Sequence, residues 1–497
     1  MLFNSFNFLI FFTVVCLAYY LIPHRFRYLF LLAVSYFFYM CWNPKYGLLM
    51  FISTVITYLS GILISRADKI QQEGRRIRWK KIFVALSFLS NLSILFFFKY
   101  FNFAVASLNR VMTHLHMAPL NVSFDVLLPV GISFYTFQAL SYTIDVYRGD
   151  IYTERNFFKY ALFVSFFPQL VAGPIERSKN LLRQISTKHT FNLWNVQSGL
   201  TQMLYGYFQK VVISDNVAIL VNKVYDNYSS YGSVELILAT VFFAIQIYCD
   251  FGGYSNIAIG AARVMGFELM ENFNTPYFSV SVADFWRRWH ISLSTWFRDY
   301  LYIPLGGNRK GKIRKYINIM IVFLASGLWH GANWHFVAWG GLNGLYQVVG
   351  DMLRPVREKV NQLLGAKKES FSHHFLEMSV TFILINISWV FFRASGIRQA
   401  FTILKRMVTC WNPWLLVSND FYKLGLNNRQ FHMVLLAILV LILIDIGKYR
   451  KKDWIGRLRK QEVWFQWAVY LVLLFWILIF GSYGPGYDAS QFIYFQF

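Results

Sequence analysis

Charged residues are scarce in this chain. Only 14% of its 497 residues are Asp, Glu, Lys or Arg, whereas a soluble globular domain carries about a quarter. Hydrophobic residues make up 56%, and the mean hydropathy is +0.41. This shortage of charge excludes a soluble globular protein, and apolar runs of about 18 residues or more recur along the whole length. We therefore predict an all-α, polytopic membrane protein in which residues 1–497 form one integral-membrane domain.

Cysteine is scarce as well, since the chain has only Cys16, Cys41, Cys249 and Cys410. They have no CxxC or other metal-type spacing and lie in or beside apolar runs. This favours small buried hydrophobic residues over disulfides or metal ligands. A basic segment is also missing ahead of the first apolar run, because the arginines follow that run in "MLFNSFNFLIFFTVVCLAYYLIPHRFR". This order predicts an uncleaved first membrane span, not a secretory signal peptide.

Acidic residues are half as numerous as basic ones, 24 against 48, so the formal net charge is +24. The basic residues gather in short loops between apolar runs, which the positive-inside rule explains without a nucleic-acid partner. We expect four of these loops to be cytoplasmic: residues 66–81, 308–315, 351–368 and 448–460. With this orientation the terminal "FIYFQF" faces outside.

About 11 transmembrane or broken helices are expected from the apolar runs. Eight lie in the outer parts of the chain, near residues 5–22, 28–42, 47–65, 82–100, 128–147, 374–392, 430–446 and 463–481. The middle is less regular, with spans near 156–172, 198–221 and 234–265 that "AGPIERSKN" and "CDFGGYSN" interrupt.

No charged residue occurs between Tyr316 and Gly350, yet this stretch holds two histidines in "SGLWHGANWHFVAWGGLNG". Because the flanking loops are both expected inside, these 35 residues must enter the membrane and return. Two crossings need about 20 residues each, so we expect two tilted or broken half-spans. His330 would then lie on the order of 20 Å deep. His335, five residues on, faces elsewhere, and the HxxxxH spacing does not fit a metal pair.

A histidine at this depth either fills a core or performs acid–base chemistry. No charged side chain stands near His330 in the sequence, so desolvation should keep it neutral and able to accept a proton. Its neighbours Trp329 and Trp334 are expected to exclude water. Gly327 and Gly331 allow close helix packing or a bend.

A second group of polar residues lies in "SVADFWRRWHISLSTWFRDYLYIPLGG", residues 279–307. The spacing predicts one helix, which Ser281 caps and Pro304 ends. Its apolar face contains Phe285, Trp289, Leu293, Trp296 and Tyr300, and its polar stripe contains Arg287, His290, Ser294 and Arg298. The stripe is either an interfacial face whose arginines meet lipid headgroups or the lining of a tunnel that holds a phosphate-bearing donor. The spacing does not separate these two alternatives.

Acidic residues inside apolar segments are functional candidates by default. The main three are Asp145, Glu176 and Asp250. We favour a structural role for each, either pairing with an arginine or capping a broken helix.

Together, "DFWRRWHISLSTWFRDYLYIPLGGNR" and "SGLWHGANWHFVAWGGLNG" resemble the paired histidine motifs of the membrane-bound O-acyltransferase family. More narrowly, the chain resembles the membrane subunits that acetylate bacterial polysaccharides such as alginate. The resemblance covers nearly the whole chain, including "PVGISFYTFQALSYTIDVYRGD", "FFPQLVAGPIERSKNLLRQI", "ENFNTPYFSVSVADFW" and "FIYFQF". Relatives usually carry CDFSGYSD where this chain has Gly252 and Asn256, which weakens any functional claim for those two positions.

The resemblance implies that His330 is the essential histidine and His290 its partner, in a central tunnel across the bilayer of a bacterial inner membrane. His330 would act as a general base or carry the acyl group, while His290 orients it or polarises the thioester carbonyl. Acetyl-CoA is the implied donor substrate, with no bound cofactor and no metal. An extracytoplasmic SGNH-type partner and a polysaccharide acceptor are also implied. We expect the donor path to be lined by Trp286, Arg287, Ser294, Arg298, Trp329 and Asn333.

Two alternatives remain. One is a D-alanyl transferase of teichoic acid, which takes its acyl group from a carrier protein, although those proteins are generally shorter. The other is a transporter without chemistry, for which internal repeats would be expected. The sequence shows no such repeats.

Overall fold

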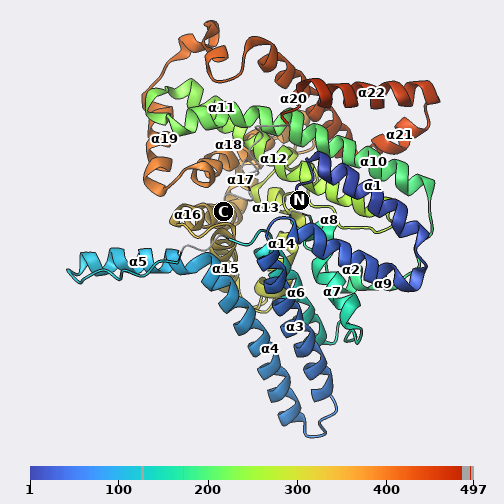
Figure 1. Cartoon of the computed structure of the whole chain (residues 1–497). Helices are drawn as coiled ribbons and strands as arrows, with labels where there is room; N and C mark the ends of the chain where they lie inside the picture. Colours follow the sequence, from blue (N-terminus) through green and yellow to red (C-terminus); the bar gives the residue numbers. More distant parts are fainter. Residues whose placement is uncertain (125–127, 172, 484–492, 494–497) are drawn as a thin grey trace. The chain divides into compact units, whose positions relative to one another are not determined.

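The computed structural model describes residues 1–124, 128–171, 173–483 and 493, which form helices joined by loops (Figure 1). The all-α prediction is therefore confirmed for this part of the chain. The chain divides into two compact units. The first comprises residues 1–200 and 258–270, and the second comprises residues 201–257 and 271–497. Of the terminal "FIYFQF", Ile493 is described, and the predicted outward orientation of the other five residues lies outside the described part.

The first unit is built mainly from the N-terminal helices. In chain order they are α1 (Phe6–Leu21), α2 (His24–Met40), α3 (Pro44–Ala67), α4 (Glu73–Leu95), the π-helix η1 (Phe96–Tyr100), α5 (Phe101–His114), α6 (Ile132–Arg148), α7 (Phe157–Ser165), α8 (Phe167–Leu170) and α9 (Ser178–Ser186). Helices α3 and α4 form a long antiparallel pair against which α6 packs (Figure 1). Ser53 of α3 donates a hydrogen bond to Asn91 of α4, so polar groups inside the pair satisfy one another.

The second unit begins within α10 (Leu193–Tyr207), which continues as the π-helix η2 (Phe208–Ser214) and α11 (Asp215–Asp226). Then come the 3₁₀ turn η3 (Tyr228–Ser230) and the long α12 (Ser233–Val264), whose last turns belong to the first unit. The elements that follow are η4 (Pro276–Phe278), α13 (Val282–Arg288), α14 (Ile291–Phe297), the π-helix η5 (Arg298–Tyr302), α15 (Lys312–His330), α16 (Trp334–Met352), α17 (Arg354–Leu363), α18 (Phe371–Arg393), α19 (Ile397–Thr409), η6 (Pro413–Val417), η7 (Asn419–Lys423), α20 (Asn428–Tyr449), α21 (Trp454–Arg459) and α22 (Val463–Phe480).

Six helical segments of the described chain are long and apolar enough to cross a membrane. They are α3, the continuous stretch Glu73–His114, α12, α18, α20 and α22. All coincide with spans expected from the apolar runs, so a polytopic membrane protein is confirmed. Helices α1 and α2 also form where spans were expected, at 16 and 17 residues.

Of the two interruptions expected in the middle of the chain, the one at "AGPIERSKN" is confirmed, because residues 173–177 lie between α8 and α9 and are not helical. The span predicted near 156–172 is two short helices, α7 and α8, because Phe166 leaves the helical region just before Pro168. The predicted break at "CDFGGYSN" is wrong, because α12 runs through it without interruption for 32 residues. A side chain at Gly253 would collide with the carbonyl oxygen of Gly206, so the glycine costs some helix propensity but permits close packing against α10.

All four cysteines are free thiols, as predicted. The expectation that they are buried holds fully for Cys249 alone, since Cys41 is exposed and Cys16 and Cys410 are half-buried. A membrane-facing surface explains this distribution, because apolar residues there need no protein cover.

Helices α15 and α16 form an antiparallel hairpin over the stretch that lacks charge. Each is a continuous helix of 19 residues, so the broken alternative is wrong, while the tilted one stays a prediction. The turn between them is confined to residues 331–333. Side chains at Gly327 and Gly340 would collide with the carbonyl oxygens of Phe336 and Phe323, so the two helices touch at their backbones.

Candidate active site

His330 is the last residue of α15, next to the tight turn of the hairpin. Its side chain is buried, with 4% of the residue exposed. Asn333 caps the N-terminus of α16 by accepting a hydrogen bond from the backbone N–H of His335. The cap and the backbone contact at Gly327 therefore hold His330 at a defined point of the hairpin.

Aromatic rings surround His330. Its ring lies edge-on to Trp329 and Trp339, with ring centroids 5.0 Å apart in both cases, and 5.5 Å from Phe392 of α18. All three aromatic residues are buried. Such walls exclude water, and the imidazole inside them can stay neutral without a counter-ion.

His290 lies in the break between α13 and α14. Its backbone is left-handed, with φ 44° and ψ 55°, which is uncommon for a residue with a branched Cγ. The side chain is completely buried, and its ring lies edge-on to Phe251, 4.6 Å between centroids. A strained backbone at a buried titratable residue is typical of functional sites.

The two histidines lie close to each other within the second unit. Their ring centroids are 6.4 Å apart, and Trp329 contacts both rings. A ring nitrogen lies only about 1 Å from its centroid, so this distance exceeds what a direct hydrogen bond of about 3 Å allows. One oxygen atom between the rings could reach both, which suits a pair of groups that handles a single hydroxyl group or carbonyl oxygen.

The predicted single helix between the Ser281 cap and Pro304 is wrong. α13 ends at Arg288, and His290 turns the chain before α14 begins. The cap at Ser281 is confirmed, since its side chain accepts a hydrogen bond from the backbone of Asp284. The apolar residues Phe285, Trp289, Leu293 and Trp296 are buried as expected, while Tyr300 is only half-buried.

Because of this break, the predicted polar stripe does not form. His290 is buried, whereas Arg287 and Arg298 are exposed, and the side chain of Arg298 pairs with Asp299 at 2.8 Å. Ser294 is half-buried and donates a hydrogen bond to the carbonyl oxygen of Trp289. The four residues do not share one face, because that stripe required a continuous helix.

Of the other residues expected to line the donor path, some are buried and some are exposed. Trp286 is buried and donates to Asn343 of α16 at 3.2 Å, and Trp329 contacts the rings of both histidines. Asn333 is exposed at the start of α16. Trp334 is 45% exposed, so Trp339 and not Trp334 forms the second tryptophan wall of His330.

The sequence reasoning missed two kinds of residue in this site. Trp339 and Phe392 contact His330, and the amide oxygen of Asn272 lies 3.0 Å from Nδ1 of His290. Asn272 lies in "ENFNTPYF", and its amide is fully buried, which is unusual for asparagine. Its position shortly before "DFWRRWHISL", the motif that contains His290, was the available clue.

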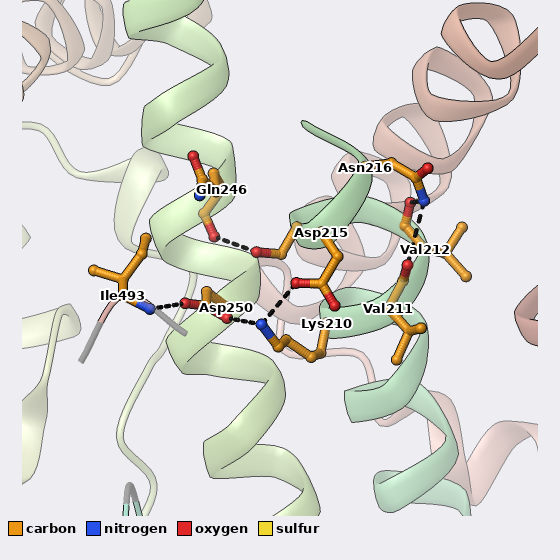
Figure 2. Close-up of polar contacts among 9 residues, drawn as sticks. Lys210, Val211, Val212, Asp215, Asn216, Gln246, Asp250 and Ile493 are labelled. Atoms are coloured by element: carbon orange, nitrogen blue, oxygen red, sulfur yellow. Dashed lines mark hydrogen bonds and ion pairs between the residues drawn. The ribbon is translucent and has the colours of Figure 1, made fainter. Parts of the chain in front are cut away.

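A buried group of charges occupies another part of the second unit. Lys210 of η2 pairs with Asp215 at 2.7 Å and with Asp250 of α12 at 2.6 Å (Figure 2). Asp250 also accepts a hydrogen bond from the backbone of Ile493 at 2.8 Å (Figure 2). The structural role predicted for Asp250 is thus supported, with a lysine as its partner in place of the expected arginine.

The two acidic candidates of the first unit are likewise held by hydrogen bonds. Asp145 accepts from the hydroxyl group of Ser178 at 2.6 Å. Glu176 accepts from the side chain of Asn180 and from the backbone N–H of Met270. Both contacts join elements of the fold, as a structural role requires.

The sequence of this chain is similar to those of several known proteins, over different lengths. A sequence profile of the membrane-bound O-acyltransferase family matches residues 149–367, a region that contains His290 and His330. The chain is 38% identical over 450 residues to the probable alginate O-acetylase AlgI of Pseudomonas aeruginosa, covering 90% of this chain and 82% of that protein. It is 34% identical over 406 residues to the peptidoglycan O-acetyltransferase of Helicobacter pylori, covering 76% and 73%.

A more distant match is the teichoic acid D-alanyltransferase of Bacillus subtilis. It is 26% identical over 243 residues, which cover 45% of this chain and 59% of that protein. The O-acetylating relatives therefore match far more of the chain, and at higher identity, than the D-alanylating one.

Proposed function

Because the chain belongs to the membrane-bound O-acyltransferase family, we propose that it O-acetylates an exported polysaccharide with acetyl groups from cytoplasmic acetyl-CoA. The observation that carries the proposal is the buried pair His290 and His330, joined by Trp329 inside aromatic walls. Its support in sequence is the match to AlgI, which extends over 90% of this chain. The enzyme would work in a bacterial inner membrane.

The transfer is balanced without any further reactant. The acceptor's O–H bond breaks, a new C–O bond forms at the acetyl carbon, and the C–S bond of the thioester breaks. The proton ends on the thiol of the released coenzyme. His330 removes the hydroxyl proton as general base, or carries the acetyl group between donor and acceptor. The aromatic walls keep out water that would hydrolyse the thioester.

Donor and acceptor would reach the histidines from opposite sides of the membrane. The four basic loops face the cytoplasm in this arrangement, and the immediate acceptor is a hydroxyl group on an extracytoplasmic SGNH-type partner or on the polymer itself. Gly74→Cys in the loop 66–81 should react with an impermeant thiol reagent only after cells are permeabilised. The measurement uses a chain whose own four cysteines are replaced by serine. Labelling on intact cells would show that this loop lies outside, opposite to the predicted orientation.

The decisive experiment supplies the purified protein, in proteoliposomes, with acetyl-labelled acetyl-CoA, the SGNH-type partner and the polysaccharide. We expect label on the polymer or partner, and none with His330→Ala. A parallel reaction with D-alanyl carrier protein tests the teichoic acid alternative. Transfer from that carrier and not from acetyl-CoA would overturn the proposed donor, while labelled peptidoglycan in place of exported polysaccharide would change the acceptor.

A further inference from the structure

The side chain of Asn272 collects an unusual number of hydrogen bonds beside His290. Its amide oxygen accepts from the backbone N–H of Ser292 at 3.3 Å and from the Ser292 hydroxyl at 2.9 Å. The same oxygen lies 3.0 Å from Nδ1 of His290. Its amide nitrogen donates to the hydroxyl of Ser255 at 3.1 Å. All four residues are at least 98% buried.

These bonds determine which end of the amide faces the histidine. A backbone N–H can only donate, so the group that meets Ser292 N must be the oxygen of Asn272. The opposite orientation would set the amide N–H₂ against this backbone donor. The amide nitrogen then has its own acceptor in Ser255. The orientation of Asn272 is therefore fixed from both ends.

The oxygen of Asn272 in turn determines where His290 carries its proton. An oxygen that faces Nδ1 at 3.0 Å requires a proton on Nδ1. A neutral imidazole has only one N–H, so Nε2 carries the lone pair. Burial disfavours the imidazolium form, which alone could donate from both nitrogens.

We infer that Asn272 is a positioning residue that locks His290 in the Nδ1–H tautomer and so makes its Nε2 a hydrogen-bond and proton acceptor. This deepens the proposed function and rests on it. A neutral His290 of this tautomer cannot donate to the thioester carbonyl, so the polarising role expected from the sequence does not apply. His290 is instead a second acceptor beside His330. The attacking hydroxyl group has one proton, and whichever of the two histidines takes it passes it to the thiolate, so the overall balance is unchanged.

The tautomer can be measured without changing Asn272. In protein with ¹⁵N-labelled histidine, solid-state NMR distinguishes protonated from unprotonated ring nitrogens, and the signals lost in His290→Gln identify those of His290. We expect a protonated Nδ1 and an unprotonated Nε2 in the unaltered protein. A protonated Nε2 with an unprotonated Nδ1 would overturn the inference. This result does not depend on transfer, so it stays interpretable if the proposed donor or acceptor is wrong.

A double-mutant cycle tests whether Asn272 acts through His290. We expect Asn272→Leu to lower kcat on the order of 10²-fold, since loss of the correct tautomer is costly in enzymes that use a positioned histidine. In a His290→Ala background the same change should alter kcat less than about twofold, because the residue on which it acts is gone. Equal losses in both backgrounds, or no loss in either, would show that Asn272 only supports the fold.

The chain offers a matched control for the loss of a buried amide. Asn386 of α18 is 9% exposed and donates to the carbonyl oxygen of Phe382 in its own helix. Asn386→Leu should leave kcat within about twofold, because its hydrogen bond is local to the helix. A fall in kcat as large as that of Asn272→Leu would mean that any buried amide matters equally, which contradicts a specific role for Asn272.

Discussion

The second unit contains two buried polar clusters that differ in charge. Lys210 is held between two carboxylates at 2.7 and 2.6 Å, whereas His290 and His330 are surrounded by aromatic rings and one neutral amide. A buried ion needs its counter-ion, so each member of the charged cluster depends on the others. A neutral imidazole needs none and can exchange a proton in place.

Burial of a polar group in a membrane protein therefore does not by itself indicate catalysis. Charged groups that neutralise one another are committed to the fold, while groups that are buried in neutral form are available for chemistry. Substitutions in the charged cluster should therefore reduce the amount of folded protein. Substitutions in the histidine cluster should reduce transfer per molecule.

The largest effect is expected at His330. His330→Gln keeps a hydrogen-bonding side chain of similar size but cannot act as a base, and we expect polymer acetylation to fall by about 10⁴-fold. The amount of protein in the membrane should stay normal. Both quantities are measured on the same cells, by ester content of the polymer and by immunoblot. Near-normal acetylation would place His330 among packing residues and remove the distinction between the clusters.

A smaller loss is expected at His290. His290→Ala should lower kcat by about 10² to 10³-fold, because a second acceptor assists the transfer but does not replace the first. Since His290 has a left-handed backbone, His290→Asn serves as the control, because asparagine tolerates that conformation. We expect His290→Asn to be as inactive as His290→Ala. An active His290→Asn protein would indicate that only the backbone turn matters.

Substitution of Lys210 should have the opposite effect to substitution of the histidines, because it should lower stability and leave transfer per folded molecule unchanged. Lys210→Met leaves two buried carboxylates without a cation and should cost about 3 to 5 kcal/mol of stability. We expect less folded protein and a lower melting temperature in detergent, with transfer per folded molecule unchanged. The triple change Lys210→Met, Asp215→Asn and Asp250→Asn should restore much of the stability, since no charge remains buried.

The partly exposed pair Lys315–Asp351 is the matched control for the charged cluster, with an N–O distance of 2.7 Å. Lys315→Met should cost at most about 1 kcal/mol, because solvent screens this pair. If Lys210→Met proves no more harmful than Lys315→Met, the buried cluster is not the structural element that we describe.

The smallest effect on transfer is expected at the exposed Arg298. Arg298→Gln should change kcat less than about twofold and the KM for acetyl-CoA less than about tenfold, because the exposed guanidinium already pairs with the half-buried Asp299. Steady-state kinetics in proteoliposomes checks both constants. A KM raised a hundredfold with kcat unchanged would mean that Arg298 binds the phosphates of the donor.

Helix positions follow from the sequence because they depend on local properties. Long apolar runs predict α3, α12, α18, α20 and α22 within a few residues, and the Ser281 cap is visible in the side chain and its spacing. The same reasoning fails at "CDFGGYSN", because the helical cost of a glycine is small compared with the close packing that Gly253 permits against Gly206.

The site could be predicted only in part. The absence of charge around His330 marks it in the sequence, and its burial in the hairpin agrees with that expectation. Trp334 was the expected wall, but the hairpin presents Trp339 to the imidazole. Which tryptophan on α16 faces α15 depends on how the two helices pack, and the spacing of residues in the sequence does not determine that contact.

The sequence by itself determined that this is an all-helical membrane protein with two histidines, His330 and His335, in an uncharged hairpin and with His290 in a segment of arginines and tryptophans. Only the tertiary structure decided that His290 leaves its helix, that its ring centroid lies 6.4 Å from that of His330, and that it meets Asn272. Local propensity favours a continuous helix through residues 282–300. The buried contacts of His290 with Phe251, Asn272 and Trp329 outweigh that preference, because packing and hydrogen bonds formed across long sequence separations exceed the few tenths of a kcal/mol per residue, roughly, that propensity supplies.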